Sequence, residues 1–325
     1  MDKIALVVVN FGGPRNLEEV RNFLEDLLTD HDVIRTGLPF FIQDFLFKKI
    51  AKKRSEKIAK DYALIGGKSP IFEDTEWVAA ALGELLNRPS VAFHRYIRKT
   101  HADFLEKLKG LDAEEIWVFP LFPQFSYATT GSIARWVSKH VPTSICKKMK
   151  WVESYPVHLS YVEAFVENIR EFLLEKGLKE EETVLLFSAH GLPESFVQKG
   201  DPYQKECQAS FQKIASYFPK AQSMLSYQSK FGRSKWIEPS TLEVCNKVSQ
   251  WIGEKKQIVF LPLSFTSDHI ETLFEVEQEY MKPLRDSGYA VYRCPALGRR
   301  KGWLDAMKVI LNNSKKVRTC SLIRL

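Results

Sequence analysis

The 325-residue chain is 45% hydrophobic and 27% charged, a composition that is typical of a soluble enzyme. Its apolar runs are far shorter than the roughly 20 residues that span a bilayer. The first residues lack the charged region and cleavage site of a signal peptide, so we expect a cytoplasmic protein. The length allows two α/β domains that each have a full core.

Strands and helices alternate along the first half of the sequence. The expected strands cover residues 4–9, 91–97, 115–120 and 149–154. The expected helices cover residues 16–28, 75–86, 102–108 and 131–140. Asn16 caps the first of these helices, and Glu18 and Glu19 lie in its first turn, where the helix dipole favours negative charge.

The second half repeats this order. The expected strands cover residues 184–187, 224–228, 258–263 and 290–294, and the expected helices cover 161–176, 204–218, 241–252, 268–282 and 303–312. Strands that alternate with helices of this length form βαβ units with parallel sheets. We therefore expect two similar Rossmann-like domains, 1–155 and 156–313, with a ligand cleft between them. The closing helix is expected to pack on the first domain, and residues 314–325 to form a loosely held tail.

An apolar segment at residues 38–47 precedes a strongly basic one. Much of the net charge of +7 comes from the cations Lys48, Lys49, Lys52, Lys53, Arg54, Lys57 and Lys60. An apolar lip beside a basic helix, at about 38–55, is typical of peripheral contact with an anionic membrane surface. It also suits the entrance for a flat, apolar, carboxylated ligand. A turn that packs on the core, followed by a solvated helix, is the simpler alternative. No motif that reads nucleic acid accompanies the charge.

His190 follows a buried apolar strand and precedes Gly191. The small neighbours Ser188 and Ala189 leave one side of the imidazole open. A neutral imidazole accepts a proton or binds a metal at physiological pH. Because ligands bind outside the carboxyl ends of strands in open parallel sheets, His190 is a candidate catalytic residue. A histidine with a purely structural hydrogen bond is the alternative.

A second strand ends in a similar way, and His269 and Glu271 follow it at the start of a helix. Glu275 and Glu279 follow Glu271 at intervals of four residues, so the three carboxylates share one helix face. Like charges at this spacing destabilise a helix slightly. The acidic stripe is therefore either solvated or used to conduct protons or cations, and Asp268 either caps the helix or belongs to the site.

Five cysteines are present, and none form a C-x-x-C pair. We expect free thiols in a reducing compartment. The sequence contains no zinc-protease motif, nucleophile elbow or phosphate-binding loop. Gly12 and Gly13 follow the first strand, but the third glycine and the distal acid of a dinucleotide loop are missing.

Seven motifs, spread over nearly the whole chain, resemble those of the ferrochelatase family, which inserts ferrous iron into a porphyrin at the end of haem synthesis. They are residues 9–14 (VNFGGP), 66–71 (GGKSPI), 123–132 (PQFSYATTGS), 186–193 (LFSAHGLP), 200–203 (GDPY), 227–232 (YQSKFG) and 265–273 (FTSDHIETL). The resemblance implies two similar domains, each with a four-stranded parallel sheet flanked by helices and with the cleft between them.

The resemblance also implies roles for individual residues. His190 resembles the catalytic histidine that faces the porphyrin nitrogens, and Glu271 resembles its acidic partner across the macrocycle. Both are the expected metal-binding residues. The residues expected to line or orient the porphyrin cleft are Phe11, Ser69, Arg95, Tyr96, Trp236, Asp268 and His269. Glu275 and Glu279 are expected to continue from Glu271 as a path for protons or metal.

Two departures from the family pattern refine these expectations. Some members hold a two-iron, two-sulfur cluster on cysteines, three of them near the C-terminus, whereas Cys320 is the only cysteine in this tail. The position of an internal cluster cysteine is Tyr127. We expect no iron–sulfur cluster and no tightly bound cofactor. The branch that uses coproporphyrin has a ligating tyrosine in the opening motif, where this chain has Phe11.

The sequence thus predicts a cluster-free, bacterial-type ferrochelatase that converts protoporphyrin IX and Fe²⁺ to protohaem, with release of two protons. A coproporphyrin III ferrochelatase and a non-catalytic porphyrin or haem carrier are the alternatives. A chelatase for cobalt or nickel is disfavoured by the motif at residues 268–271. Peripheral contact with the inner face of a membrane is compatible with this function, and no nucleic acid partner is expected.

Overall fold

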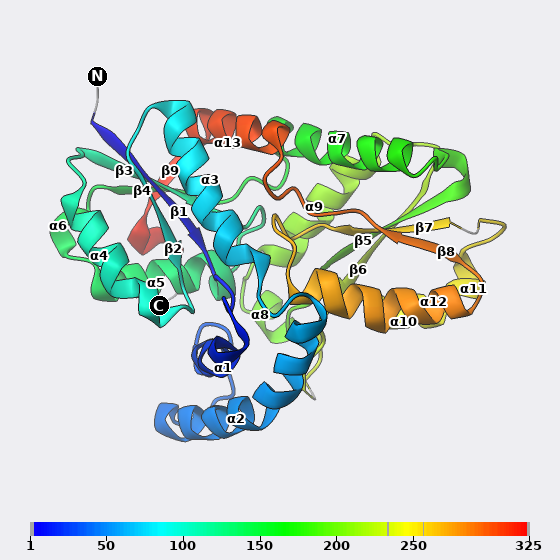
Figure 1. Cartoon of the computed structure of the whole chain (residues 1–325), viewed down its shortest axis with the longest axis horizontal. Coiled ribbons are helices and arrows are strands. Elements are labelled where there is room, and N and C mark those ends of the chain that lie inside the picture. The colour runs from blue at the N-terminus through cyan, green and yellow to red at the C-terminus, as the bar shows by residue number, and fades with distance from the viewer. Residues whose placement is uncertain (1–2, 233, 256, 324–325) are drawn as a thin grey trace. The chain divides into compact units, whose positions relative to one another are not determined.

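A computed structural model describes residues 3–232, 234–255 and 257–323 (Figure 1). The chain divides into two compact units. Unit 1 holds residues 1–154 and 307–325, and unit 2 holds residues 155–306. The division therefore falls inside the last long helix, α13 (Lys301–Asn313). Each unit has a sheet of its own.

The sheet of unit 1 has four parallel strands and one antiparallel edge strand. Their order is β2 (Ser90–His94), β1 (Ile4–Asn10), β3 (Glu115–Pro120), β4 (Met149–Val152) and β9 (Lys316–Arg318). All seven residues of β1 are buried, as expected for a parallel strand that is covered on both faces. The expected four parallel strands are confirmed, and the fifth strand was not expected.

The helices next to this sheet are α3 (Pro70–Leu86), α4 (His101–Gly110), α5 (Ser132–His140) and α6 (Thr143–Cys146). Two further helices, α1 (Val20–Leu28) and α2 (Phe40–Leu64), pack on each other. Phe104 of α4 and Trp136 of α5 pack against Phe93 of β2, with ring centroids 4.6 Å apart in both cases. In Figure 1, α1 and α2 lie beyond the end of the sheet at which β1 terminates.

The expectation of a loosely held tail is wrong for the described residues of that segment. β9 pairs with β4, and Leu322 is completely buried in the core of unit 1. The indole nitrogen of Trp151 donates a hydrogen bond to the hydroxyl of Thr319 at 3.0 Å. The basic composition of the tail concealed these contacts, because the buried residues Thr319 and Leu322 lie among half-buried and exposed ones.

Unit 2 contains a fully parallel four-stranded sheet. Its order is β6 (Gln222–Gln228), β5 (Thr183–His190), β7 (Gln257–Pro262) and β8 (Ala290–Arg293). The helices before and around it are α7 (Leu159–Glu175), α8 (Glu194–Gln198), α9 (Tyr203–Ala215), α10 (Thr241–Asn246), α11 (Val248–Trp251) and α12 (Lys282–Asp286). Phe165 of α7 and Phe211 of α9 pack on Phe187 of β5. α10 and α12 lie on the opposite face (Figure 1).

The helix expected over residues 268–282 is a π-helix for most of its length. This element, η5 (Glu271–Met281), continues directly into α12. Val276, Tyr280 and Met281 of η5 are buried against the sheet. A π-helix bonds residue i to residue i+5, and such segments are frequent at functional sites. The sequence predicted a helix here but not its winding.

Candidate active site

The carboxyl end of β5 presents His190. Its main-chain nitrogen donates to the hydroxyl of Ser264 at 2.9 Å, and its carbonyl accepts from the hydroxyl of Tyr203 at 2.9 Å. The next residue must be glycine, because a Cβ on Gly191 would lie 2.7 Å from the carbonyl oxygen of Gln228. The backbone that carries the imidazole is therefore fixed on both sides.

One nitrogen of the His190 ring is hydrogen-bonded to the backbone, and the other faces Glu271. Nδ1 lies 2.5 Å from the carbonyl oxygen of Gly191, so Nδ1 carries a proton and donates it there. Nε2 lies 3.5 Å from Oε1 of Glu271. The side chains of His190 and Glu271 are 38% and 30% exposed, so a ligand can reach both. A backbone carbonyl that fixes the tautomer is the usual arrangement for a histidine that binds a metal.

Glu271 is the first residue of η5 and lies between two imidazoles. Its Oε2 is 3.3 Å from Nε2 of His269, which is itself buried. Asp268 orients the start of the helix, because its carboxylate accepts from the hydroxyl of Thr272 and from Arg293, both at 2.8 Å. His269 and Asp268 thus support the carboxylate that the sequence placed in the site.

The charges of the pair depend on each other. Burial acts to lower the pKa of His190, but the charge and hydrogen bond of Glu271 and the carbonyl of Gly191 outweigh it, so the pKa is raised to about 9. Burial acts to raise the pKa of Glu271, but His190 and His269 hold it well below its usual range. At neutral pH the pair is therefore an imidazolium beside a carboxylate.

The expectation that Glu271 faces His190 across a bound macrocycle is wrong. A flat ring needs about 7 Å between the atoms on its two faces, since each face requires van der Waals contact at about 3.5 Å. Nε2 of His190 and Oε1 of Glu271 are only 3.5 Å apart. Both residues belong to unit 2, and at this separation no flat ring fits between the two side chains.

The three carboxylates of the acidic stripe have different surroundings. Glu275 is half-buried, and its oxygens accept hydrogen bonds from the main-chain nitrogen of Ser229 at 2.8 Å, the hydroxyl of Ser229 at 2.6 Å and the hydroxyl of Tyr280 at 2.6 Å. Burial, together with the charge of Glu271, raises the pKa of Glu275. Glu279 is exposed. The stripe therefore runs from an ionised pair to a solvated residue.

Trp236 belongs to the surroundings of His190. Residues 193 and 236 form an isolated β-bridge, and the main-chain nitrogen of Ile237 donates to the carbonyl of Leu192 at 2.9 Å. A Cβ on Gly191 would lie 3.0 Å from the indole ring of Trp236. The ring is half-buried and covers the turn that follows His190.

In unit 1, the residues expected to line the cleft lie beyond β1 and β2. Phe11 is half-buried, and its ring contacts those of Tyr96 and Phe122 at centroid distances of 5.0 and 4.9 Å. Arg95 donates to Asp30 at 2.7 Å and to Ser132 at 3.1 Å. These contacts place Arg95 at the end of the strand in a fixed orientation.

Ser69 and Tyr96, which were also expected to line the cleft, are buried within unit 1. They are 2% and 1% exposed. The hydroxyl of Tyr96 donates to Asp30 at 3.0 Å, and a Cβ on Gly13 would lie 2.4 Å from the Cβ of Ser69. The two residues pack the loops that carry Phe11 and Arg95. Asp30, which is 4% exposed and was missed from sequence, holds this network together.

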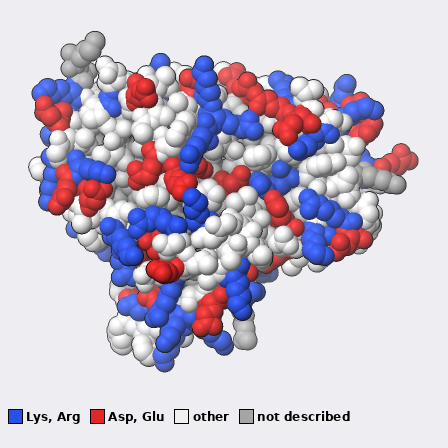
Figure 2. Space-filling model, in the orientation of Figure 1, with Lys and Arg blue, Asp and Glu red and all other residues white. Residues whose placement is uncertain are grey.

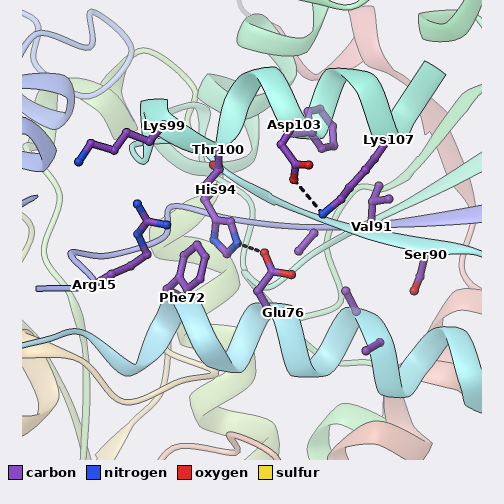
Figure 3. Close-up of a pocket in the computed structure, with 14 residues that line it drawn as sticks. Arg15, Phe72, Glu76, Ser90, Val91, His94, Lys99, Thr100, Asp103 and Lys107 are labelled. Carbon is purple, nitrogen blue, oxygen red and sulfur yellow. Dashed lines mark hydrogen bonds and ion pairs between the residues drawn. The ribbon is translucent and has the colours of Figure 1, made fainter. Parts of the chain in front are cut away.

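A separate pocket of about 560 Å³ lies in unit 1 between α3, β2 and α4 (Figure 3). Its charged groups face one another: His94 contacts Glu76 at 2.8 Å, and Lys107 contacts Asp103 at 2.8 Å. None of the residues predicted for the site lines it. We therefore do not assign the reaction to this pocket.

Within the described ranges 3–232, 234–255 and 257–323, no group of three or more histidine, cysteine, aspartate or glutamate side chains is arranged to hold a metal ion. The five cysteines are free thiols; burial raises the pKa of Cys245 and of Cys294 to about 12. The expectation of no iron–sulfur cluster stays a prediction.

Comparison with known proteins decides the family. A family model described as Ferrochelatase matches residues 3–315. A protein named Ferrochelatase from Chlamydia abortus is 42% identical over 318 residues, which cover 98% of each chain. Another from Chlamydia caviae is 41% identical over 320 residues, or 98% of this chain and 99% of its own.

The chain belongs to the ferrochelatase family. Ferrochelatases are metal-insertion enzymes of haem biosynthesis, so the chain is an enzyme whose substrates are iron and a porphyrin. The family predicted from the seven motifs is confirmed.

Solved structures show the same chelatase fold. SirB from Bacillus subtilis with Fe³⁺ has a TM-score of 0.55 at 12% identity, and the match covers 98% of this chain and 95% of the SirB chain. CbiX, the terminal enzyme of sirohaem synthesis in denitrifying bacteria, has a TM-score of 0.51 at 15% identity. The match covers 73% of this chain and 90% of the CbiX chain. No helix in the described part of the chain is both long and apolar enough to cross a membrane.

Proposed function

We propose that the protein inserts Fe²⁺ into protoporphyrin IX at the pair formed by His190 and Glu271. The reaction forms the bonds between iron and the four ring nitrogens and releases the two pyrrole protons. The observation that carries the proposal is the 3.5 Å approach of His190 Nε2 to Glu271 Oε1 at the carboxyl end of β5, where parallel sheets bind ligands. Imidazole and carboxylate are both suitable ligands for ferrous iron.

The pair acts as one group on one side of the macrocycle. In the resting site the proton on Nε2 balances the charge of Glu271, because the pKa of His190 is raised to about 9. An arriving Fe²⁺ would displace that proton, which leaves to water, and would be held by the two side chains. When the iron moves into the ring, Nε2 accepts one pyrrole proton and the carboxylate of Glu271 accepts the other.

Glu271, Glu275 and Glu279 give the released protons a route to solvent. Glu275 suits an intermediate position, since burial and the charge of Glu271 raise its pKa. Glu279 is exposed and would deliver the proton to water. The porphyrin must also bend before its nitrogen lone pairs can meet the iron, and enzymes impose such distortion at a cost of roughly 1–5 kcal/mol.

Phe11 favours protoporphyrin IX over coproporphyrin III. Its ring packs on Tyr96 and Phe122 and offers no oxygen to an iron at the ring centre. We expect anaerobic assays with Fe²⁺ to give a higher kcat/KM with protoporphyrin IX than with coproporphyrin III. A preference for coproporphyrin III would overturn this choice of substrate, and binding of either porphyrin without turnover would identify a carrier.

The beginning of α2 forms an apolar surface beside a basic one. Phe40, Phe41 and Phe45 are 71%, 75% and 62% exposed. The ammonium group of Lys49 lies 4.3 Å from the centre of the Phe45 ring. Figure 2 shows uncoloured atoms gathered where α2 begins and Lys or Arg atoms further along it. This segregation favours peripheral contact with an anionic bilayer, in which the rings enter the interface and the lysines meet lipid head groups.

Removal of four charges tests this contact. We expect replacement of Lys48, Lys49, Lys52 and Lys53 by alanine to weaken binding to vesicles of anionic lipid by at least about 10-fold, because each lysine near such a surface contributes about 1 kcal/mol. Sedimentation with the vesicles measures this. The matched control replaces four exposed lysines of unit 1 outside α2, namely Lys99, Lys109, Lys139 and Lys147. Equal partitioning of both variants and the wild type would refute membrane contact.

A further inference from the structure

Gln228 is a buried amide at the end of β6, 1% exposed, beside both elements of the site. In the parallel pairing of β5 and β6, Gln228 is the register partner of His190. Its main-chain carbonyl accepts from the nitrogen of Gly191 at 2.7 Å. The turn that carries the imidazole is thus bonded to the backbone of Gln228.

The side chain of Gln228 connects β5 to η5. Its Oε1 accepts from the hydroxyl of Ser188 at 2.7 Å, two residues before His190. Its Nε2 donates to the carbonyl oxygen of Glu271 at 2.9 Å and to Oε2 of Glu275 at 3.3 Å. The amide can take only this orientation, since a flipped amide would set its oxygen against those two acceptors.

We propose that Gln228 is a positioning residue that sets the approach of Glu271 to His190. One rigid side chain bonds the strand that ends in the imidazole and the first residue of the π-helix that carries the carboxylate. Ser229 strengthens this link, because its φ of 65° is rare for a residue with a side chain and turns its main-chain nitrogen towards Glu275. Such strain persists where the surrounding contacts determine the geometry.

Two variants separate positioning from packing. Gln228→Met keeps the length of the side chain but removes the donor and the acceptor. Gln228→Glu keeps an acceptor for Ser188, and its carboxylate has no donor for Glu271 or Glu275. A carboxylate so close to these acceptors repels the start of η5. Gln222→Met is the matched control on the same strand, because the amide of Gln222 donates to the carbonyl of Trp251 at 2.8 Å, away from the turn that carries His190.

The inference rests on the proposed function, so the test has one readout with substrates and one without. We expect both Gln228 variants to lower kcat for iron insertion by about 10–100-fold, the scale for partners that orient metal ligands. The porphyrin dissociation constant, measured by fluorescence, is expected to stay within about 2-fold, and the Gln222 variant to match the wild type. If Gln228→Met does not fold, the kcat of Gln228→Glu tests the proposal, because a glutamate side chain has the same shape as glutamine.

A crystal structure of substrate-free Gln228→Glu gives the second readout. We expect Glu271 to move out of ion-pair distance from His190. An unchanged pair, or wild-type kcat in the folded variants, overturns the positioning role even when the wild type is active. A wild-type protein that inserts no iron refutes the proposed function, whereas the distance between His190 and Glu271 in the variant still tests the inference.

Discussion

Replacement of His190 by alanine is expected to lower the rate of iron insertion by about 100-fold or more, the scale of a positioned acid–base group. Nε2 of His190 faces Glu271 from the end of β5, and Nδ1 is hydrogen-bonded to the carbonyl of Gly191. A flat, apolar ring is expected to bind mainly through burial of apolar surface, so we expect the affinity for porphyrin to change little. Anaerobic haem formation and porphyrin fluorescence measure the two effects separately.

A control for this variant is His158→Ala. His158 is in the same unit, and its ring accepts from the main-chain nitrogen of Ser160 at the start of α7. Loss of this cap is expected to reduce stability without changing the turnover of the folded enzyme. Near wild-type turnover in His190→Ala would exclude His190 as the proton acceptor and move the reaction to another group.

Replacement of Glu271 by glutamine is expected to lower the maximum rate of insertion and shift its pH dependence. Second-sphere changes alone cost about 10–100-fold, so loss of a direct partner is expected to cost at least about 10-fold. Burial lowers the pKa of His190, and it is Glu271 that overcomes this and raises the pKa to about 9. Without that charge the pKa of His190 falls.

The direction of the pH shift follows from the role of Nε2. Only neutral His190 accepts a pyrrole proton, so the wild-type rate is expected to rise with pH up to about 9. In Glu271→Gln we expect the rate to rise at a pH at least about one unit lower. Loss of about 1.4 kcal/mol of charge interaction lowers the pKa of His190 by one unit. Glu277→Gln is the control, because Glu277 lies on the same π-helix and bonds Arg293 at 3.0 Å. A profile that does not move would show that the pair is not coupled.

Local patterns in the sequence were sufficient to predict most of the strands and helices of the fold. The apolar strands that end at His190 and Pro262 are buried as expected, because a strand covered on both faces must be apolar throughout. The tail was mispredicted for the opposite reason: β9 is an edge strand whose side chains are only partly buried, so its composition resembles that of a loop.

The residues of the candidate site were named from the sequence, whereas their geometry was not predicted. His190 and Glu271 were recognised from their motifs, yet the separation of 3.5 Å between them depends on two strands being neighbours in the sheet and on the winding of η5. Gln228 belongs to the motif at residues 227–232, but no local pattern indicates that its amide bonds two elements. Asp30 and Tyr96 also became a buried pair only through packing.

The sequence by itself determined the alternation of strands and helices, the family and the choice of candidate reactive side chains, because apolar periodicity and motif chemistry are local properties of a chain. The tertiary structure alone decided that His190 and Glu271 form one ion pair with linked pKa values. The physical reason is that charge interaction and desolvation depend on distances between atoms far apart along the chain, and folding sets those distances.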